Sequence, residues 1–92
     1  MVRSVVLSSR ARKDLRNVPR FIQDKLLGWV GAVELRGLEE VRKVPGYHDE
    51  PLGGERQGQR SIRLNRAYRA VYVVVGESVQ FVQVEEINKH DY

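Results

Sequence analysis

Residues 58–75 show the clearest hydrophobic pattern of the chain, and they predict a β-hairpin with a tight turn at 65–67. Apolar and polar residues alternate along the first arm, and β-branched and aromatic residues dominate the second. Successive side chains of a strand point to opposite faces, so Ile62 and Leu64 can reach a core while Arg63 points away from it. We therefore expect functional groups on the face that carries Arg63.

The N-terminal half predicts a strand followed by two helices. Residues 2–7 are mostly apolar and predict the first strand, and Ser8 or Ser9 can cap a helix over 10–17. Pro19 ends that helix and supplies the first-turn residue of the next one. The two helices should form a hairpin.

The second helix has a longer apolar stripe. The positions that follow the helical period are Ile22, Leu26, Val30 and Val33, and those expected to widen the buried stripe are Phe21, Leu27 and Trp29. Gly37 is placed to end the helix, and residues 38–43 offer one or two further helical turns before Pro45. The stripe is typical of a packed core.

The rest of the chain predicts a loop, a turn and a last strand. Residues 47–59 contain Gly, Pro and charges and should form a long loop, residues 76–78 a turn, and residues 79–87 a strand. The order is strand, two helices, a short helix and three strands. It favours an α+β fold in which the helical hairpin packs on one face of a twisted, mainly antiparallel four-stranded sheet. The other face would be concave, basic and partly open.

Composition limits the function. The 92 residues allow one domain, 1–92, and include no cysteine for disulfides or a cysteine-rich metal site. No apolar run is long enough for a membrane span or a secretory signal, so we expect a soluble cytoplasmic protein. With 16 basic and 12 acidic residues, the net charge of +4 favours a polyanionic partner such as RNA, DNA or the ribosome.

Four arginines lie within ten residues of the hairpin, at 60, 63, 66 and 69. A guanidinium stays charged and presents a fork of donors, which suits binding of a phosphate and neutralisation of charge that develops on it. The alternative is a solvated sheet face with local ion pairs. His48 and His90 are the only histidines, and they lack the spacing of a metal site. We expect neither a metal nor another cofactor.

The C-terminal residues could supply proton transfer. Lys89, His90 and Tyr92 follow the last strand, and histidine has the side-chain pKa nearest neutrality. Arginines with such groups could cleave RNA, in which the 2′-OH is a built-in nucleophile. DNA has no such hydroxyl. A frayed, solvated chain end is the alternative.

Three segments, 51–65, 68–72 and 84–92, resemble the HigB-like branch of the RelE/ParE superfamily of type II toxins, and the leading strand and helices also fit. This resemblance implies a RelE-like fold and a toxin that cleaves mRNA in the ribosome without metal. It implies that Arg63 and Arg69 hold the scissile phosphate and that His90 or Tyr92 is the acid or base. Many HigB-like chains end in Asp-Tyr-His, whereas this one ends in Lys-His-Asp-Tyr, so the register of the tail stays open.

The resemblance also implies partners. They are an antitoxin, of helix-turn-helix type in other HigB systems, and the ribosome with its mRNA. In this interpretation Lys89 is a third catalytic candidate. The expected RNA-binding residues are Arg56, Arg60, Arg66 and His48. Two other functions stay open: a ParE-like inhibitor of DNA gyrase, and a nucleic-acid-binding accessory domain without catalysis.

Overall fold

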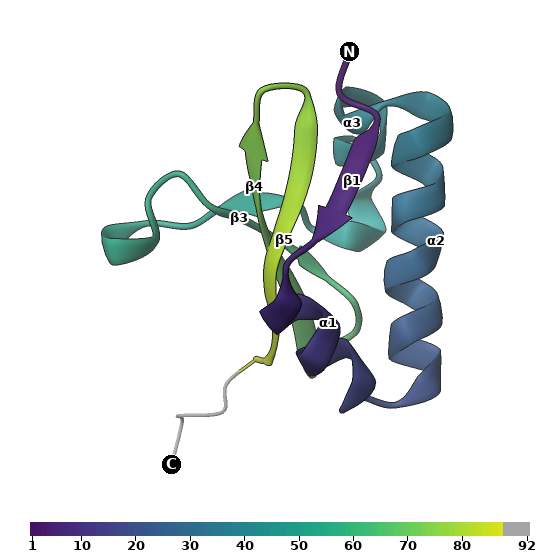
Figure 1. Cartoon of the computed structure of the whole chain (residues 1–92), viewed down its shortest axis with the longest axis vertical. Coiled ribbons are helices and arrows are strands. Elements are labelled where there is room, and N and C mark those ends of the chain that lie inside the picture. Colours follow the sequence, from purple (N-terminus) through teal and green to yellow (C-terminus); the bar gives the residue numbers. More distant parts are fainter. Residues whose placement is uncertain (88–92) are drawn as a thin grey trace.

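The computed structural model describes residues 1–87. Its helices are α1 (Ser9–Arg16), α2 (Arg20–Arg36) and α3 (Leu38–Arg42), and two 3₁₀ turns are η1 (Pro45–Tyr47) and η2 (Gly54–Arg56). Its strands are β1 (Ser4–Leu7), β2 (Glu50–Pro51), β3 (Arg60–Arg63), β4 (Tyr68–Val75) and β5 (Ser78–Glu86). Figure 1 shows α2 along one side of the sheet, with the loop that contains η2 projecting away on the other side.

The strands form one sheet in the order β1-β5-β4-β3-β2. Strand β1 pairs with β5 in parallel, and all other neighbours are antiparallel. The four expected strands are present in the α+β arrangement predicted from the sequence. The fifth strand is β2, whose two residues pair with Ser61 and Arg60. It lies inside the segment 47–59 that was expected to be entirely loop.

The predicted helix boundaries are confirmed to within a residue or two. Ser8 caps α1, because its hydroxyl accepts a hydrogen bond of 3.0 Å from the N–H of Ala11. Helix α2 begins directly after Pro19 and ends at Gly37, whose φ of 91° is a conformation that favours glycine. Among the described helices, none is long and apolar enough to cross a membrane.

The core lies between the helices and the sheet. Trp29, Tyr72 and Phe81 pack with ring centroids 5.3–5.8 Å apart and are fully buried. The expectation that Phe21 and Leu27 widen the buried stripe of α2 is wrong, since they are 64% and 55% exposed. The helix buries a narrow stripe, and these two side chains project from its flanks. The buried residues of the stripe are Ile22, Leu26, Trp29 and Val33.

Candidate nucleic-acid interface

A β-bulge sets which side chains of β5 reach the open face of the sheet. Near the β4–β5 turn, Tyr72 pairs with Phe81, but Val71 pairs with Gln83, so Val82 has no direct partner in β4. Beyond this bulge the register shifts by one residue. Glu85 is therefore placed opposite Arg69, and Val84 turns into the core.

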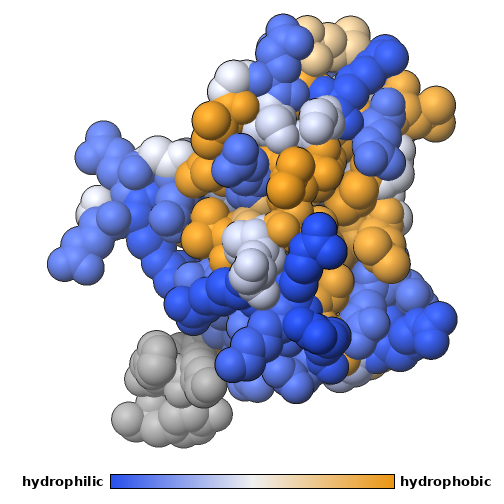
Figure 2. All heavy atoms as spheres, in the orientation of Figure 1, coloured by the Kyte–Doolittle hydropathy of each residue, from blue (hydrophilic) through white to orange (hydrophobic). Residues whose placement is uncertain are grey.

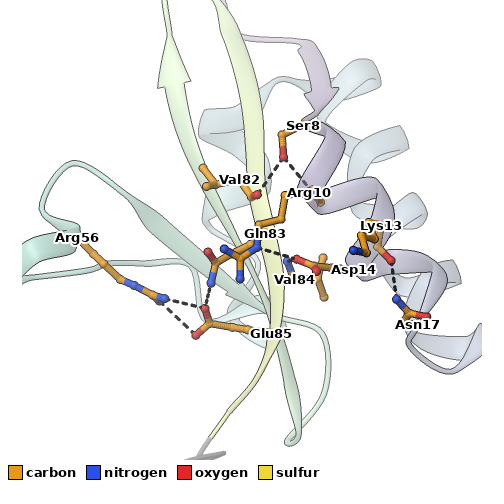
Figure 3. Close-up of polar contacts among 11 residues, drawn as sticks. Ser8, Arg10, Lys13, Asp14, Asn17, Arg56, Val82, Gln83, Val84 and Glu85 are labelled. Atoms are coloured by element: carbon orange, nitrogen blue, oxygen red, sulfur yellow. Dashed lines mark hydrogen bonds and ion pairs between the residues drawn. The ribbon is translucent and has the colours of Figure 1, made fainter.

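Residues of the N-terminal segment hold the bulge. The hydroxyl of Ser8 donates to the carbonyl of Val82 over 2.9 Å, and the Ser8 N–H donates to the carbonyl of Phe81 over 3.0 Å. The Asp14 carboxylate accepts a 3.1 Å hydrogen bond from the N–H of Val84. Figure 3 shows the contacts of Ser8 with Val82 and of Asp14 with Val84, beside Arg56, Gln83 and Glu85. The start of α1 thus fixes the position from which Glu85 projects.

Glu85 binds two arginines from different elements. Arg69 donates from Nε and Nη2 to Glu85 Oε2, over 3.0 and 2.8 Å. Arg56 donates from Nη1 to Oε2 over 3.2 Å and from Nη2 to Oε1 over 2.9 Å, reaching across from η2 (Figure 3). The side-chain amide of Gln83 also donates to Oε1. We call Arg56, Arg69, Gln83 and Glu85 the Glu85 cluster.

The electrostatics of this cluster leave an excess of positive charge. Partial burial alone would raise the pKa of Glu85, but hydrogen bonds from Arg56 and Arg69, together with their charges, outweigh burial and lower the pKa to about 2. Glu85 is therefore ionised at neutral pH and is a weak proton acceptor. One negative charge faces two guanidinium groups, which leaves a net charge of +1.

Arg63 adds to this excess. It is exposed at the end of β3 and pairs in register with Arg69, so the two side chains leave the same face of the sheet. Among residues 1–87, no ion pair or side-chain hydrogen bond engages Arg63. Like charges opposite one another are unfavourable in a sheet, and a bound anion would relieve that repulsion.

Two other expected RNA-binding residues lie in exposed segments. Arg66 is in the predicted turn, in which the Asn65 side chain accepts 2.8 Å hydrogen bonds from the N–H groups of Ala67 and Tyr68. His48 follows η1 and has a φ of 46°. Neither makes an ion pair with a described residue, and their contact with RNA stays a prediction.

Arg60 belongs to a second arginine–carboxylate cluster. Its Nε donates over 2.7 Å to Asp49, whose side chain is only 1% exposed, and the Tyr72 hydroxyl donates over 2.6 Å to the same carboxylate. Burial and the hydrogen bond to Asp49 raise the pKa of Tyr72 to about 12. We call these three residues the Asp49 cluster. Strand alternation turns Arg60 to the face opposite Arg63, so the structure separates it from the Glu85 cluster.

Lys89, His90 and Tyr92 lie outside the described residues, so their expected roles stay predictions. The last described residue is tied to the hairpin turn, since the Ile87 N–H donates to the carbonyl of Ala67 over 2.7 Å. Within residues 1–87 no group of three or more His, Asp or Glu side chains could hold a metal ion.

The open face has two different halves. Sheet register places Val6, Val73 and Val75 on the same face as Arg69, toward the β4–β5 turn, and Val6 and Val75 are 47% and 53% exposed. Figure 2 shows hydrophobic atoms across the middle of the molecule, with hydrophilic side chains at its top, over its lower end and on the projecting loop. These valines surround the exposed Gln80, and the buried Val71 and Ser61 lie between them and the charged cluster.

Sequence reasoning missed Glu85, although it had singled out Arg56 and Arg69. An unbroken hairpin register would place Val84 opposite Arg69, and only the bulge brings Glu85 there. The sequence does contain a sign of this bulge. Val79 and Phe81 are apolar at odd-numbered positions, whereas Val84 is apolar at an even-numbered position of the same strand. An odd step of this kind indicates a bulge.

Comparisons with known proteins support the fold. No protein-family model and no curated protein sequence matches the chain. The structure is similar to YafQ from E. coli strain BL21(DE3), with a TM-score of 0.73, 16% identity, and coverage of 90% of this chain and 91% of YafQ. It is also similar to a YoeB/ParE toxin from Agrobacterium tumefaciens, with a TM-score of 0.68, 18% identity, and coverage of 91% and 98%.

A third similar structure is a toxin–antitoxin complex, RelBE2 from Mycobacterium tuberculosis. Its TM-score is 0.58 at 24% identity, with coverage of 91% of this chain and 96% of the matched one. The chain therefore has the fold of RelE/ParE-type toxins, as the sequence resemblance implied. The HigB-like branch is not distinguished by these similarities and stays a prediction.

Proposed function

We propose that this protein is the toxin of a type II toxin–antitoxin system and that it cleaves mRNA on the ribosome. The observation that carries the proposal is the excess of guanidinium charge on the open face of a RelE-type sheet. Arg63 and Arg69 project from paired strands on the same face of the sheet, and Arg56 reaches Glu85 beside Arg69 from the loop. Groups of this kind hold and neutralise phosphates.

The proposed reaction is attack of the ribose 2′-OH on the adjacent phosphate, without a metal. Arg63 and Arg69 would stabilise the negative charge that develops on the phosphate oxygens. His90 and Tyr92 are the proposed groups for proton transfer, with Lys89 as the third candidate.

The proposed partners follow from the same fold. One similar structure is the toxin–antitoxin complex RelBE2, and another is the YoeB–YefM complex from Staphylococcus aureus. We propose that a cognate antitoxin of helix-turn-helix type neutralises this chain in the cytoplasm. An acidic segment of the antitoxin would complement the net charge of +4.

The test is induction in bacterial cells of the unmodified protein and of His90→Ala, with mapping of the 5′ ends of one mRNA in translated and untranslated forms. We expect new ends only on the translated message, and their loss in the variant. Arg69→Ala should also remove cleavage. Undiminished cleavage in both variants would contradict the site assignment.

A gyrase inhibitor is the second candidate, because one similar structure is named a YoeB/ParE toxin. Growth arrest with intact mRNA would favour it. Deletion of residues 89–92 separates the two candidates, since a toxin that only binds should tolerate the loss of the tail better than a nuclease. Salt-dependent RNA binding with neither cleavage nor growth arrest would instead indicate an accessory binding domain.

A further inference from the structure

The Glu85 carboxylate is saturated with hydrogen bonds. It accepts two from Arg69, two from Arg56 and one from Gln83, which exceeds the roughly four lone-pair positions of a carboxylate. No capacity remains for a ribose hydroxyl. This saturation, with a pKa of about 2, argues against Glu85 as the base of the reaction.

The arginines present to Glu85 the same donor edges that would bind a phosphodiester. Two oxygens of a carboxylate and two non-bridging oxygens of a phosphate accept the same fork of N–H groups. Arg56 donates from both Nη atoms to Glu85, and Arg69 donates from Nε and Nη2. A phosphate that binds these edges must therefore take the place of the carboxylate.

We propose that Glu85 is an internal competitor of the RNA phosphate, which binds by displacing it from Arg56 and Arg69. The cluster is suited to exchange, since the Arg56, Arg69 and Glu85 side chains are 37%, 28% and 22% exposed. Among residues 1–87, the two hydrogen bonds between Arg56 and Glu85 are the only side-chain hydrogen bonds that join the 52–59 loop to β5. Exchange at Arg56 thus breaks no other side-chain hydrogen bond between this loop and β5.

This inference rests on the proposed function and adds a reason for ribosome dependence. Isolated RNA must compete with a carboxylate that is already in place, so its affinity is lowered. A larger assembly that positions the message supplies the binding free energy needed for exchange. Glu85 then acts as a specificity-determining residue that suppresses binding of free RNA.

The test is binding of a fluorescent 2′-O-methyl RNA octamer, which lacks the nucleophile, measured by anisotropy at low salt. The variant is Glu85→Gln and the matched control is Glu86→Gln, which makes the same charge change at an exposed position opposite Tyr68. We expect the Glu85→Gln protein to bind about tenfold more tightly than the control, because charged hydrogen bonds are freed.

A double-mutant cycle shows whether the gain passes through Arg56. In an Arg56→Gln background, the gain from Glu85→Gln should fall to about threefold. Equal or weaker binding by Glu85→Gln relative to Glu86→Gln would overturn the proposal, as would a gain independent of Arg56 and Arg69. Thermal unfolding confirms that the variants are folded. If Glu85→Gln does not fold, Glu85→Asp keeps the charge but shortens the reach, and it should bind about threefold more tightly than the unmodified chain.

The outcome is separable from that of the proposed function. A tenfold gap between the two glutamine variants without mRNA cleavage in cells would support the anion exchange and reject the nuclease. Cleavage in cells without that gap would support the nuclease and reject the role of Glu85.

Discussion

The two arginine–carboxylate clusters share strand β4 but differ in charge balance and in the exposure of their carboxylates. In the Asp49 cluster, one carboxylate that is 1% exposed binds one arginine and one neutral tyrosine hydroxyl. In the Glu85 cluster, one carboxylate that is 22% exposed binds two arginines, and Arg63 stands beside them. The carboxylate of the first cluster is buried and binds one arginine, with Arg42 acting on the Tyr72 hydroxyl, whereas the carboxylate of the second is partly exposed and binds two arginines.

In our proposal, this difference separates a structural use of arginine from a functional one. A buried, balanced pair has little to offer an incoming anion, and its loss leaves an uncompensated charge inside the protein. A partly exposed cluster with surplus charge can exchange its carboxylate for a phosphate. Arginines on neighbouring strands thus acquire different roles, which depend on how many arginines share one carboxylate and on how deeply that carboxylate is buried.

The largest effect on stability should come from Asp49→Ala. Removing this carboxylate leaves the Arg60 guanidinium and the Tyr72 hydroxyl without their acceptor, so we expect a loss of about 3 kcal/mol in the free energy of unfolding. Urea denaturation measures it. Asp24→Ala is the control, since its pair with Arg20 is 61% and 85% exposed and should contribute less than about 0.5 kcal/mol. Equal losses of unfolding free energy in the two variants would show that the burial of Asp49 does not make its ion pair more important for stability than the exposed pair of Asp24.

Glu85→Gln should have a smaller effect that depends on pH. The pKa of Glu85 is lowered from 4.5 to about 2, so its contribution is complete above about pH 5 and is lost as the pH falls through about 2. The shift sets an upper limit of about 3 kcal/mol, and with solvent screening we expect roughly 1–2 kcal/mol. Urea denaturation of the unmodified chain and the variant at pH 6 and pH 3 measures the difference. A constant difference across this range would show that Glu85 is not held by the arginines.

Ser8→Ala tests how the Glu85 cluster is positioned. The hydroxyl caps α1 and also donates to the carbonyl of Val82 at the bulge, so we expect a loss of about 1 kcal/mol in the free energy of unfolding. Amide hydrogen exchange at Gln83 and Val84 should become faster, while exchange at Ser61, near the Asp49 cluster, should not change. Uniform acceleration would indicate general destabilisation in place of a local effect at the bulge.

Much of the fold could be predicted because local signals and tertiary structure agree. Ser8, Pro19 and Gly37 mark helix boundaries through capping and backbone preference, and alternation at Ile62 and Leu64 assigned the faces of β3 correctly. Strand β2 could not be foreseen, since its two residues, Glu50 and Pro51, have no strand propensity and are held only by pairing with β3.

The site was only partly predictable, for a geometric reason. The alternation of side chains along a strand predicts that Arg63 and Arg69 share one face. It does not predict which carboxylates from other segments bind these arginines. Glu85 reaches Arg69 through a one-residue bulge, and Asp49 reaches Arg60 across a turn that has no regular period. Ion pairs between distant segments depend on register, which composition does not encode.

The smallest effect on stability, and the sharpest separation from function, is expected for Arg63→Gln. Arg63 is exposed and makes no ion pair within residues 1–87, so the free energy of unfolding should change by less than about 0.5 kcal/mol. It stands beside the proposed phosphate position, so binding of the 2′-O-methyl octamer should weaken about three- to tenfold. The slope of log K against log salt concentration should also become shallower by about one unit, as expected for the loss of one phosphate contact. Arg20→Gln, an equal charge change at the start of α2, should leave both nearly unchanged. Equal weakening by the two substitutions would mean that net charge, and not the position of Arg63 beside the Glu85 cluster, attracts the anion.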